Sequence, residues 1–514
     1  MSVVSRHVPV DLQGRRAVVV GAGIAGLATA LSLGERGAEV LLLEADPPML
    51  ADSAEEAFSD WPRRKVPQFR HSHAFLARLR NILLRAYPEI YRALLDEGAR
   101  ELRLLDFPPP TMGALAPEPG DEQLAAIGCR RATFEWVLRR HVESKPWARI
   151  LSEHTVKGLV TDGRSLPEVR GVRVDDGRGH HRAIAVDLVV DASGRTSRAP
   201  QWLEDAGAKR PFEKRSTSAI LYYTRFYRLR PGVEFPAPTE HPAMADFGWI
   251  KFAVFPADRS TFSITFATHL AFARLKILAD VGPFEEMART FPGLAPFADP
   301  RTAEPLPIDG RQVMAMGGIE NCRRRFVDGD GKPLAIGFFA IGDSAYHTNP
   351  LYGRGSTQAF MHASLLGEAL DAAAGDPVRA ATLLDEGARE EIEPFYRASV
   401  AADLVASRRV GALPSTLPEW FGDSFFEHGI LPASRTDPVV FRAFLRMFYM
   451  VETPEQAFFR PDVLARGFVA WLRSPWLYPR VMPSAPRFEK AIEACERAGG
   501  AVRERLPPPV RIAR

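Results

Sequence analysis

Apolar and polar positions near the start of the chain follow two different periods. The run 17–20 is apolar and predicts a buried strand, residues 24–35 have the spacing of an amphipathic helix, and 39–43 predicts a second strand. Gly37 separates the helix from the second strand, as expected where a helix ends. We therefore predict a βαβ unit with two parallel strands.

Further strand patterns follow in two groups. Residues 150–191 alternate in short runs, separated by Asp-Gly pairs at 162–163 and 176–177, and close on an apolar strand at 186–190. This pattern predicts a β-meander joined by hairpins. A second sheet is predicted from strand patterns at 219–226, 249–255 and 261–268.

Helical and loop patterns flank these strands. Residues 74–98 have helical spacing, and residues 107–120 are rich in proline and glycine, which indicates a loop on the substrate side. A last apolar strand is expected at 334–341, and helical spacing dominates beyond residue 356, with an interruption at 413–418. Strands and helices in this order are typical of an α/β protein.

The composition supports a folded protein with several domains. The chain has 514 residues, of which 46% are apolar and 25% charged, and this usage is typical of globular proteins. The net charge of +3 is too small for an extended phosphate-binding surface, so we expect no nucleic-acid partner. Cys129, Cys322 and Cys495 form no CxxC pair and suit a reducing compartment. Since no leader pattern and no apolar run of membrane-spanning length occurs, we expect a cytoplasmic protein.

The first chemical motif lies in the turn of the βαβ unit. The sequence GAGIAG places Gly21, Gly23, Ala25 and Gly26 between strand and helix, and Glu44 follows the second strand. Such glycines let backbone N–H groups approach a pyrophosphate at the helix N-terminus, and the acid accepts hydrogen bonds from ribose hydroxyls. The unit predicts dinucleotide binding without distinguishing NAD from FAD.

A second motif follows the last apolar strand. Asp343 ends this strand, and Pro350, Gly353 and Gly355 precede a helix. An acid in this place can bind the ribityl hydroxyls of FAD, and a glycine-lined helix N-terminus can face the flavin pyrimidine ring. The alternative is an ordinary strand-loop-helix junction in which Asp343 caps the helix. This alternative is less favoured because the two motifs occur together and in this order.

Together the motifs resemble those of FAD-dependent monooxygenases with the para-hydroxybenzoate hydroxylase fold, whose relatives include squalene epoxidase and the bacterial polyether polyene epoxidases. The resemblance covers most of residues 16–370 and includes a third motif, DASG, at 191–194. The segment KVPQFRHSH at 65–73 is similar to the V-P-Q-x-R-H-x-H run of the polyene epoxidase branch.

The resemblance implies an architecture and further cofactor contacts. Gln68 and Arg131 match residues that contact FAD, and Val156 matches a residue whose backbone contacts the adenine. The implied α/β fold has a Rossmann-type FAD-binding domain with a β-meander, a second substrate domain built on a mixed sheet, and a helical C-terminal region. The expected boundaries are 1–75, 125–205 and 330–375 for the FAD-binding domain, 76–124 and 206–329 for the substrate domain, and 376–514 for the helical C-terminal region.

The resemblance also implies the chemistry. Reduced FAD would react with O2 to give a C4a-hydroperoxide, which epoxidises or hydroxylates a lipophilic small molecule. Since the chain has no second GxGxxG, electrons would come from transiently bound NADPH or NADH, or from a separate flavin reductase. Because the flavin makes the bonds, the protein has to position the substrate and exclude water. We therefore expect few catalytic side chains and name none.

Three residues are candidates for the substrate pocket, namely His71, Tyr346 and His347. His71 and His73 would share one face of a strand, as two metal ligands could, but no third ligand is near, so we expect no metal. For Tyr346 and His347, which lie between Asp343 and Pro350, packing within the loop is the alternative.

Other functions of the same fold stay open. The segment 249–268 loosely resembles the Y-x-W-x-F-P segment of geranylgeranyl reductases, which leaves reduction of a prenyl chain as an alternative. Trp249 begins a partial match to the W-x-W-x-I-P motif of flavin-dependent halogenases, but the second tryptophan is absent. Lys65 is the residue that could stand in for the lysine of those enzymes, but it belongs to the charged run 63–65, which is expected to be solvated. A non-enzymatic binding protein on a flavoprotein fold is the alternative of another class.

One helix of the C-terminal region is clearly marked. Asp437 is the predicted N-cap before Pro438, and the apolar stripe that follows includes Phe441. The main interpretation is a stripe packed on the rest of the protein. The alternative is a weak contact with a membrane surface, in which Arg442 and Arg446 would form a thin cationic face and the protein would be peripheral to the membrane.

Overall fold

A parallel sheet forms the centre of the computed structural model, which describes residues 10–237, 241–308, 310–481 and 486–499. Its five strands are in the order β18-β9-β1-β2-β5, and every pairing is parallel. The predicted βαβ unit is confirmed, with α1 (Ile24–Gly34) between its two strands. The strands are β1 (Arg16–Val20), β2 (Glu39–Leu43), β5 (Ala148–Leu151), β9 (Leu188–Asp191) and β18 (Phe338–Ala340).

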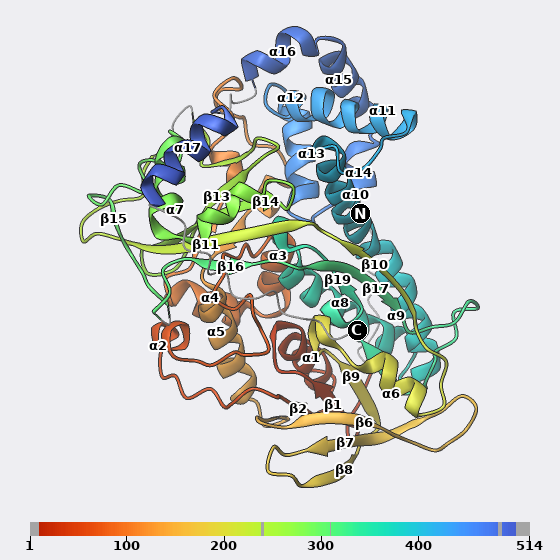
Figure 1. Ribbon diagram of the computed structural model, residues 1–514. Helices are drawn as coiled ribbons and strands as arrows, with labels where there is room; N and C mark the ends of the chain where they lie inside the picture. Colours follow the sequence, from red (N-terminus) through yellow and green to blue (C-terminus); the bar gives the residue numbers. More distant parts are fainter. Residues whose placement is uncertain (1–9, 238–240, 309, 482–485, 500–514) are drawn as a thin grey trace.

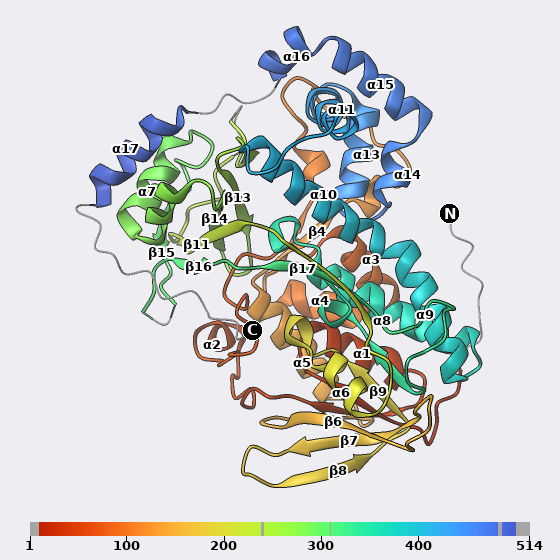
Figure 2. The same cartoon turned by 45° about the vertical axis from the view of Figure 1, so that its right-hand side comes forward.

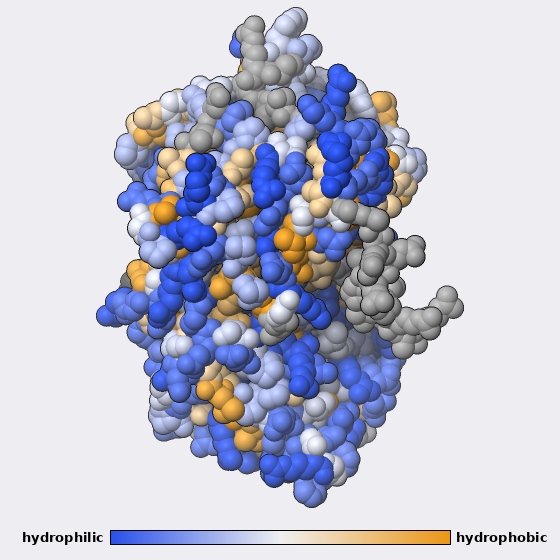
Figure 3. Space-filling view, turned by 60° about the vertical axis from the view of Figure 1, so that its left-hand side comes forward, coloured by the Kyte–Doolittle hydropathy of each residue, from blue (hydrophilic) through white to orange (hydrophobic). Residues whose placement is uncertain are grey.

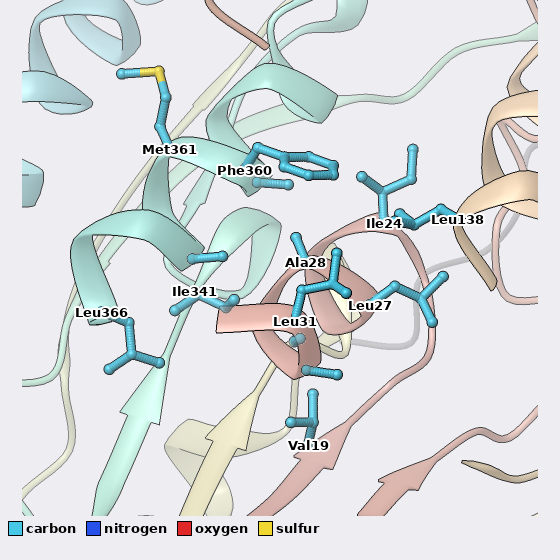
Figure 4. Close-up of a cluster of buried hydrophobic side chains, with 14 of the residues drawn as sticks. Val19, Ile24, Leu27, Ala28, Leu31, Leu138, Ile341, Phe360, Met361 and Leu366 are labelled. Atoms are coloured by element: carbon cyan, nitrogen blue, oxygen red, sulfur yellow. The ribbon is translucent and has the colours of Figure 1, made fainter. Parts of the chain in front are cut away.

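The main core lies between this sheet and three helices, α1, α5 (Arg131–Glu143) and α8 (Gly355–Ala372). Figure 4 shows Ala28 and Leu31 of α1 between Phe360 of α8 and Val19 of β1, and all four residues are buried. Burial of these apolar side chains fixes α1 and α8 against each other, so the starts of both helices lie at the same edge of the sheet.

The predicted meander is confirmed for β6 (Thr155–Thr161), β7 (Val169–Asp175) and β8 (His181–Ala185), which form an antiparallel sheet, but the closing strand predicted at 186–190 is β9 of the central parallel sheet. The three-stranded sheet lies at the bottom of Figure 1, and α6 (Ala199–Asp205), which comes after β9, packs on β6. The last apolar strand is shorter than the predicted 334–341, because Gly337 has a left-handed backbone with φ 77° and β18 begins after it.

The second sheet is confirmed, with the order β12-β13-β14-β11-β15 and β16 also paired to β11. One side of it is covered by α7 (Val281–Thr290) and by α17 (Phe488–Gly499), which pack on each other (Figure 1). The other side faces the central sheet and its helices. The strands are β11 (Ile220–Leu229), β12 (Met244–Asp246), β13 (Lys251–Pro256), β14 (Thr261–His269), β15 (Ala303–Pro305) and β16 (Met314–Met316).

A small sheet and a buried ion pair join the two large sheets. The small sheet consists of β10 (Phe212–Thr217), β17 (Glu320–Arg325) and β19 (Tyr346–His347). Arg130, just before α5, donates to Asp258 in the hairpin between β13 and β14, with Nη2 and Oδ2 2.6 Å apart and both side chains fully buried. The second sheet is therefore fixed in position against the central one.

The segment 74–98 forms two helices, α3 (Ala77–Ala86) and α4 (Pro88–Asp96), because Pro88 begins a new helix. These helices pack on α8 and α5 of the central layer. β3 (Arg100–Leu102) and β4 (Ala126–Gly128) pair with each other, and α2 (Ala54–Ser59) packs on α5. The loop expected at 107–120 has no helix or strand and contacts the C-terminal region.

The predicted C-terminal helix is α13 (Pro438–Phe448), and Asp437 caps it by accepting from the Val439 amide at 2.9 Å. Phe441 is buried, and the Arg442 guanidinium is buried in an ion pair with Asp121 at 2.9 Å. The membrane-surface alternative is therefore wrong for this helix. The other helices are α9 (Pro377–Glu391), α10 (Glu393–Arg409), α11 (Leu417–Phe425), α12 (Leu431–Ala433), α14 (Pro454–Phe458), α15 (Pro461–Leu472) and α16 (Ser474–Val481).

Candidate cofactor site

The turn between β1 and α1 has the geometry of a phosphate-binding turn. A Cβ on Gly26 would lie 1.8 Å from the carbonyl oxygen of Gly21, so no larger residue fits where the helix passes over the turn. Near Gly23, the space is open except for a guanidinium nitrogen of Arg63 at 3.7 Å. The turn and the first residues of α1 therefore leave backbone N–H groups accessible to an anion.

The Glu44 carboxylate lies beside this turn. Its Oε2 accepts from the Ala22 amide at 3.1 Å, and its Oε1 accepts from the Asp46 amide at 3.0 Å. Burial raises the pKa of Glu44, but the charge and hydrogen bond of Arg63, together with the two amide hydrogen bonds, outweigh burial and hold that pKa below its usual value. The carboxylate is therefore ionised, and its remaining lone pair on Oε1 can accept from a ribose hydroxyl.

Arg63 is a residue that the sequence analysis missed. It belongs to the charged run expected to be solvated, and Lys65 is indeed exposed, but Arg63 is only 5% exposed. Its guanidinium contacts Glu44 at 2.8 Å and Asp46 at 3.3 Å, and it donates to Glu135 of α5. The sequence signal that could have indicated a buried arginine was the pair of acids after β2, Glu44 and Asp46, because two buried carboxylates need a positive charge nearby.

A second charged group lies after β18. Asp343 is in the turn Gly342–Ser344, and its Oδ2 is 3.3 Å from Nδ1 of His347. Burial raises the pKa of Asp343, but His347, Arg131 and Arg195 together outweigh burial and lower it below its usual value. An ionised carboxylate that interacts with two arginine charges can accept from ribityl hydroxyls while the arginines bind a pyrophosphate.

The start of α8 leaves buried polar atoms without partners. Among the described residues, nothing forms a hydrogen bond with Oγ1 of Thr357 or with either amide atom of Gln358, although both residues are buried. Gly355 is close to Asp343, since a Cβ on Gly355 would be 3.8 Å from Oδ1. Buried unpaired polar atoms at a helix N-terminus fit the edge of a flavin ring, which both donates and accepts. The residues present therefore fit FAD.

Pro350 and Gly353 lie in the segment 349–354, which precedes α8 and is called the flavin turn below. Leu351 packs against a small apolar cluster that includes Ile220, Tyr222 and Ala267 of the second sheet. Gly353 has a left-handed backbone with φ 66°, and its Cβ position is 3.0 Å from the Ala74 side chain. The flavin turn thus lies between the starting point of α8 and the second sheet.

The second sheet presents a mostly small and neutral surface to the flavin turn. Strand pairing places the side chains of alternate residues on this side. We call it the FAD-facing side, and it comprises Tyr222, Thr224, Phe226, Lys251, Ala253, Phe255, Ser263, Thr265 and Ala267.

The two histidines contact the FAD-facing side and its neighbours. His71 Nδ1 is 3.1 Å from Oγ1 of Thr224, and His73 is 3.2 Å from a guanidinium nitrogen of Arg131. Burial lowers the pKa of His71 to about 4, and burial together with Arg131 lowers that of His73 to about 3. Both rings are therefore neutral at pH 7, and they line a cavity of about 10 Å³ against the second sheet.

The remaining predicted residues, Gln68, Val156 and Tyr346, lie in three different surroundings. Gln68 is half-buried, and its carbonyl accepts from the His71 amide at 3.1 Å. Val156 is in β6, two residues after His154, whose amide donates to the Glu44 carbonyl at 2.9 Å. Tyr346 is buried in the main core, and its ring packs against Tyr396. Within the described ranges, no three side chains come together as metal ligands would.

Comparisons with known proteins agree with this geometry. Residues 16–56 match the family model for the FAD dependent oxidoreductase. The chain is 28% identical over 466 residues to Protein Rv3254 of Mycobacterium tuberculosis, which covers 85% of this chain and 90% of that protein.

Solved structures of flavoproteins share the fold. A flavoprotein/dehydrogenase from Cytophaga hutchinsonii has a TM-score of 0.60 at 15% identity, covering 90% of this chain and 99% of that one. The flavin-dependent brominase Bmp2 has a TM-score of 0.56 at 16% identity, covering 91% and 99%. OxyS anhydrotetracycline hydroxylase from Streptomyces rimosus has a TM-score of 0.52 at 18% identity, covering 85% and 76%.

At these identities the solved structures establish the fold alone. The fold is that of FAD-binding flavoproteins, with a parallel sheet, antiparallel sheets and a helical C-terminal region. The family match at the βαβ unit, the fold and a site whose residues fit FAD support one conclusion: the chain is an FAD-dependent oxidoreductase.

Proposed function

We propose that this protein is an FAD-dependent monooxygenase that epoxidises or hydroxylates a hydrophobic small molecule. The observation that carries the proposal is the position of the flavin turn: its Asn349 accepts from the hydroxyl of Tyr222 on β11, and its Leu351 packs against an apolar cluster made mostly by the second sheet. A flavin bound at the start of α8 would therefore have its reactive ring next to a wall of another domain. Such an arrangement encloses a substrate between cofactor and wall.

The residues around the site have distinct tasks in this proposal. Glu44 and the turn from Gly21 to Gly26 bind the adenosine half, Arg131 and Arg195 bind the pyrophosphate, and Asp343 binds the ribityl chain. When bound, FAD supplies the activation of O2 and the transfer of oxygen. The protein's own residues orient the cofactor and exclude water from it.

The FAD-facing side would provide the substrate wall. Ala253, Ala267 and Phe255 are apolar, and Thr224 and Thr265 form a hydrogen bond with each other at 2.8 Å, so this part of the wall is neutral. A neutral wall favours a lipophilic substrate, because an apolar ligand gains by leaving water. His71 and His73 would complete the wall as uncharged rings.

Electrons would reach the flavin from NADPH or NADH bound transiently, or from flavin reduced by a partner reductase. The sequence has a single GxGxxG turn, which the FAD would occupy. A comparison of the purified protein with NADPH, with NADH and with chemically reduced flavin distinguishes these sources.

Oxygen-isotope labelling tests the proposed reaction. The FAD-loaded protein is incubated under ¹⁸O₂ with terpenoid, polyene and steroid substrates and a reduced nicotinamide, and products are analysed by mass spectrometry. One ¹⁸O atom per product molecule is expected. Product without label rejects the oxygenase, turnover under strict anaerobiosis indicates a prenyl-chain reductase, and a requirement for chloride or bromide indicates a halogenase. A protein that stays colourless after FAD soaking indicates the non-enzymatic binding protein.

A weak contact with a membrane surface also belongs to this proposal, since lipophilic substrates dissolve in membranes. The face in Figure 3 is mostly hydrophilic with scattered apolar residues, whereas α11, α15 and α16 carry several large exposed apolar side chains. Of the described helices, none has both the length and the hydropathy needed to cross a bilayer. The exposed residues are Leu417, Trp420, Phe421, Phe468, Leu472 and Trp476.

Co-sedimentation with vesicles tests this contact. We expect partial binding to anionic vesicles and its loss when Trp420 and Trp476 are both changed to serine. Leu50→Ser removes an exposed leucine elsewhere on the surface and is the matched control. Equal binding of all three proteins would reject the contact at these helices.

A further inference from the structure

The flavin turn is contacted from behind by α10, a helix of the C-terminal region. Figure 2 shows α10 between the upper helices and the strand β17, and it also packs on β19. At the first residue of the turn, Nδ2 of Asn349 donates to Oδ1 of Asp403 on α10 at 2.7 Å. Oδ1 of Asn349 accepts from the Leu351 amide at 3.1 Å and from the Tyr222 hydroxyl.

Asp403 is itself fixed on its second oxygen. Oδ2 accepts from Nδ2 of Asn321 on β17 at 2.7 Å, and Oδ1 of Asn321 accepts from the Asn349 main-chain amide at 2.7 Å. All three side chains are buried. Two amide NH2 groups donate to one carboxylate here, so a side chain with only one acceptor atom cannot replace Asp403 as long as position 349 keeps its amide.

The other end of the flavin turn is attached to the same helix. Nη1 of Arg354 donates to the Phe395 carbonyl at 2.9 Å and to Oγ of Ser399 at 2.6 Å, and the guanidinium is buried. Positions 395, 399 and 403 are spaced by four residues and therefore share one face of α10. One helix face thus contacts both ends of a six-residue segment.

We propose that α10 positions the flavin turn, with Asp403 and Ser399 as positioning residues for FAD. The inference rests on the proposed function, which places the flavin at the start of α8. The turn contains Gly353 and is followed by Gly355 at the start of α8, and glycines leave a chain many conformations, so contacts from outside are needed to hold the turn in one. A cofactor site requires its groups within about 0.5 Å of the productive geometry, and α10 provides this precision.

Exchanging the amide and the carboxylate tests the inference. In D403N a single amide oxygen replaces the two carboxylate oxygens that accept from Asn321 and Asn349, so one of these two hydrogen bonds is lost. In N349D two carboxylates face each other, and the hydrogen bond between positions 349 and 403 is lost. The double variant N349D/D403N restores it: the new amide at 403 donates to the new carboxylate at 349 and accepts from Asn321. The other oxygen at position 349 still accepts from Leu351 and Tyr222.

Two measurements on the full chain follow the turn and the cofactor separately. Hydrogen–deuterium exchange of the peptide that covers 349–354, without FAD, reports how firmly the turn is held. The Kd for FAD, from quenching of flavin fluorescence, reports the cofactor. For each single variant we expect about tenfold faster exchange and about a tenfold higher Kd, the effect of one lost charge-assisted hydrogen bond. The double variant should return to within about twofold of the wild type.

A matched control and the contrary outcomes complete the test. D385N removes the Asp385 carboxylate from its ion pair with Arg325 on β17, away from the turn, and should change neither quantity. If a single variant does not fold, S399A takes its place, with faster exchange expected around Arg354. Unchanged exchange in the variants, or no rescue in the double variant, overturns the inference. Faster exchange with an unchanged Kd also overturns it, whereas a wild type that binds no FAD rejects the proposed function first.

Discussion

Replacing Arg63 by alanine tests whether a buried charge cluster supports the nucleotide side of the site. The Arg63 guanidinium contacts Glu44 at 2.8 Å and Asp46 at 3.3 Å, and donates to Glu135. Removing one partner of a buried ion pair costs about 3–5 kcal/mol, because an uncompensated charge stays in the interior. Since three carboxylates lose a partner here, we expect a loss near the upper end, about 5 kcal/mol.

The loss should depend on pH with a definite sign. In the wild type the folded-state pKa of Glu44 is below its usual value, so Glu44 stabilises the fold above that value and loses this contribution as the pH falls. Without Arg63, only the amide hydrogen bonds of Ala22 and Asp46 oppose burial, so the pKa of Glu44 rises above its wild-type value. The variant then gains stability relative to the wild type as the pH falls through this higher pKa. The difference between wild type and variant is therefore expected to shrink between about pH 8 and about pH 5.

Urea unfolding of the protein without FAD measures both effects. Circular dichroism and tryptophan fluorescence are recorded at the two pH values for the wild type, R63A and R64A. Arg64 is the exposed neighbour in the sequence, and its replacement should change the stability by about 0.5 kcal/mol or less. If R63A is no less stable than R64A, or if its deficit is the same at both pH values, the reasoning about the buried cluster is refuted.

Three further outcomes are expected. G26A should abolish FAD binding, measured by flavin absorbance, because its Cβ would lie 1.8 Å from a backbone oxygen, while G422A, at a site with no atom within 4 Å, should bind normally. Burial raises the pKa of Asp403 to about 6, although Asn321, Asn349 and Lys251 act in the opposite direction. The contribution of Asp403 to the free energy of unfolding should therefore fall as the pH rises from 3.8, the usual pKa of an aspartate, to about 6, and this pH dependence should vanish in D403N. Parallel curves of stability against pH for the two proteins would contradict this. Cys129, Cys322 and Cys495 are buried and should react with a thiol reagent only after unfolding; rapid labelling of the native protein would contradict it.

Local patterns account for much of the fold. The βαβ unit, the meander, the strands of the second sheet and the Asp437 cap of α13 follow from periods and turn residues that a window of some ten positions contains. The departures are local too: Pro88 divides one predicted helix, and Gly337 shortens the last strand. Placement of α17 against α7 was not predictable in this way, because the two helices are about 200 residues apart and meet only through their apolar faces.

The site shows the same division. The glycine turn, Glu44 and Asp343 were predicted because each lies within one strand–turn–helix unit. Arg63 and Asp403 were not, since each is defined by partners from other elements, as in the contact of Arg63 with Glu135 across 72 residues and that of Asp403 with Asn321 across 82. The charged run that contains Arg63 gives no sign of such burial by itself, and the only signal lay elsewhere in the sequence, in the two acids after β2.

A substitution at Gln358 should change the stability of the protein and its affinity for FAD in opposite directions. Its amide is buried at 1% exposure, and neither polar atom has a partner among the described residues. An unpaired buried polar group costs about 1–3 kcal/mol, so Gln358→Met, which keeps the volume and removes both polar atoms, should raise the stability of the protein without FAD by about that amount. If the amide bonds to the flavin edge, the same change should weaken FAD binding about tenfold.

Urea unfolding without FAD and a fluorescence titration with FAD measure the two effects, with Gln201→Met, at an exposed position, as the control. Opposite signs identify Gln358 as a group held unpaired for the cofactor, whereas a more stable variant with unchanged FAD affinity would show that the amide does not contact FAD.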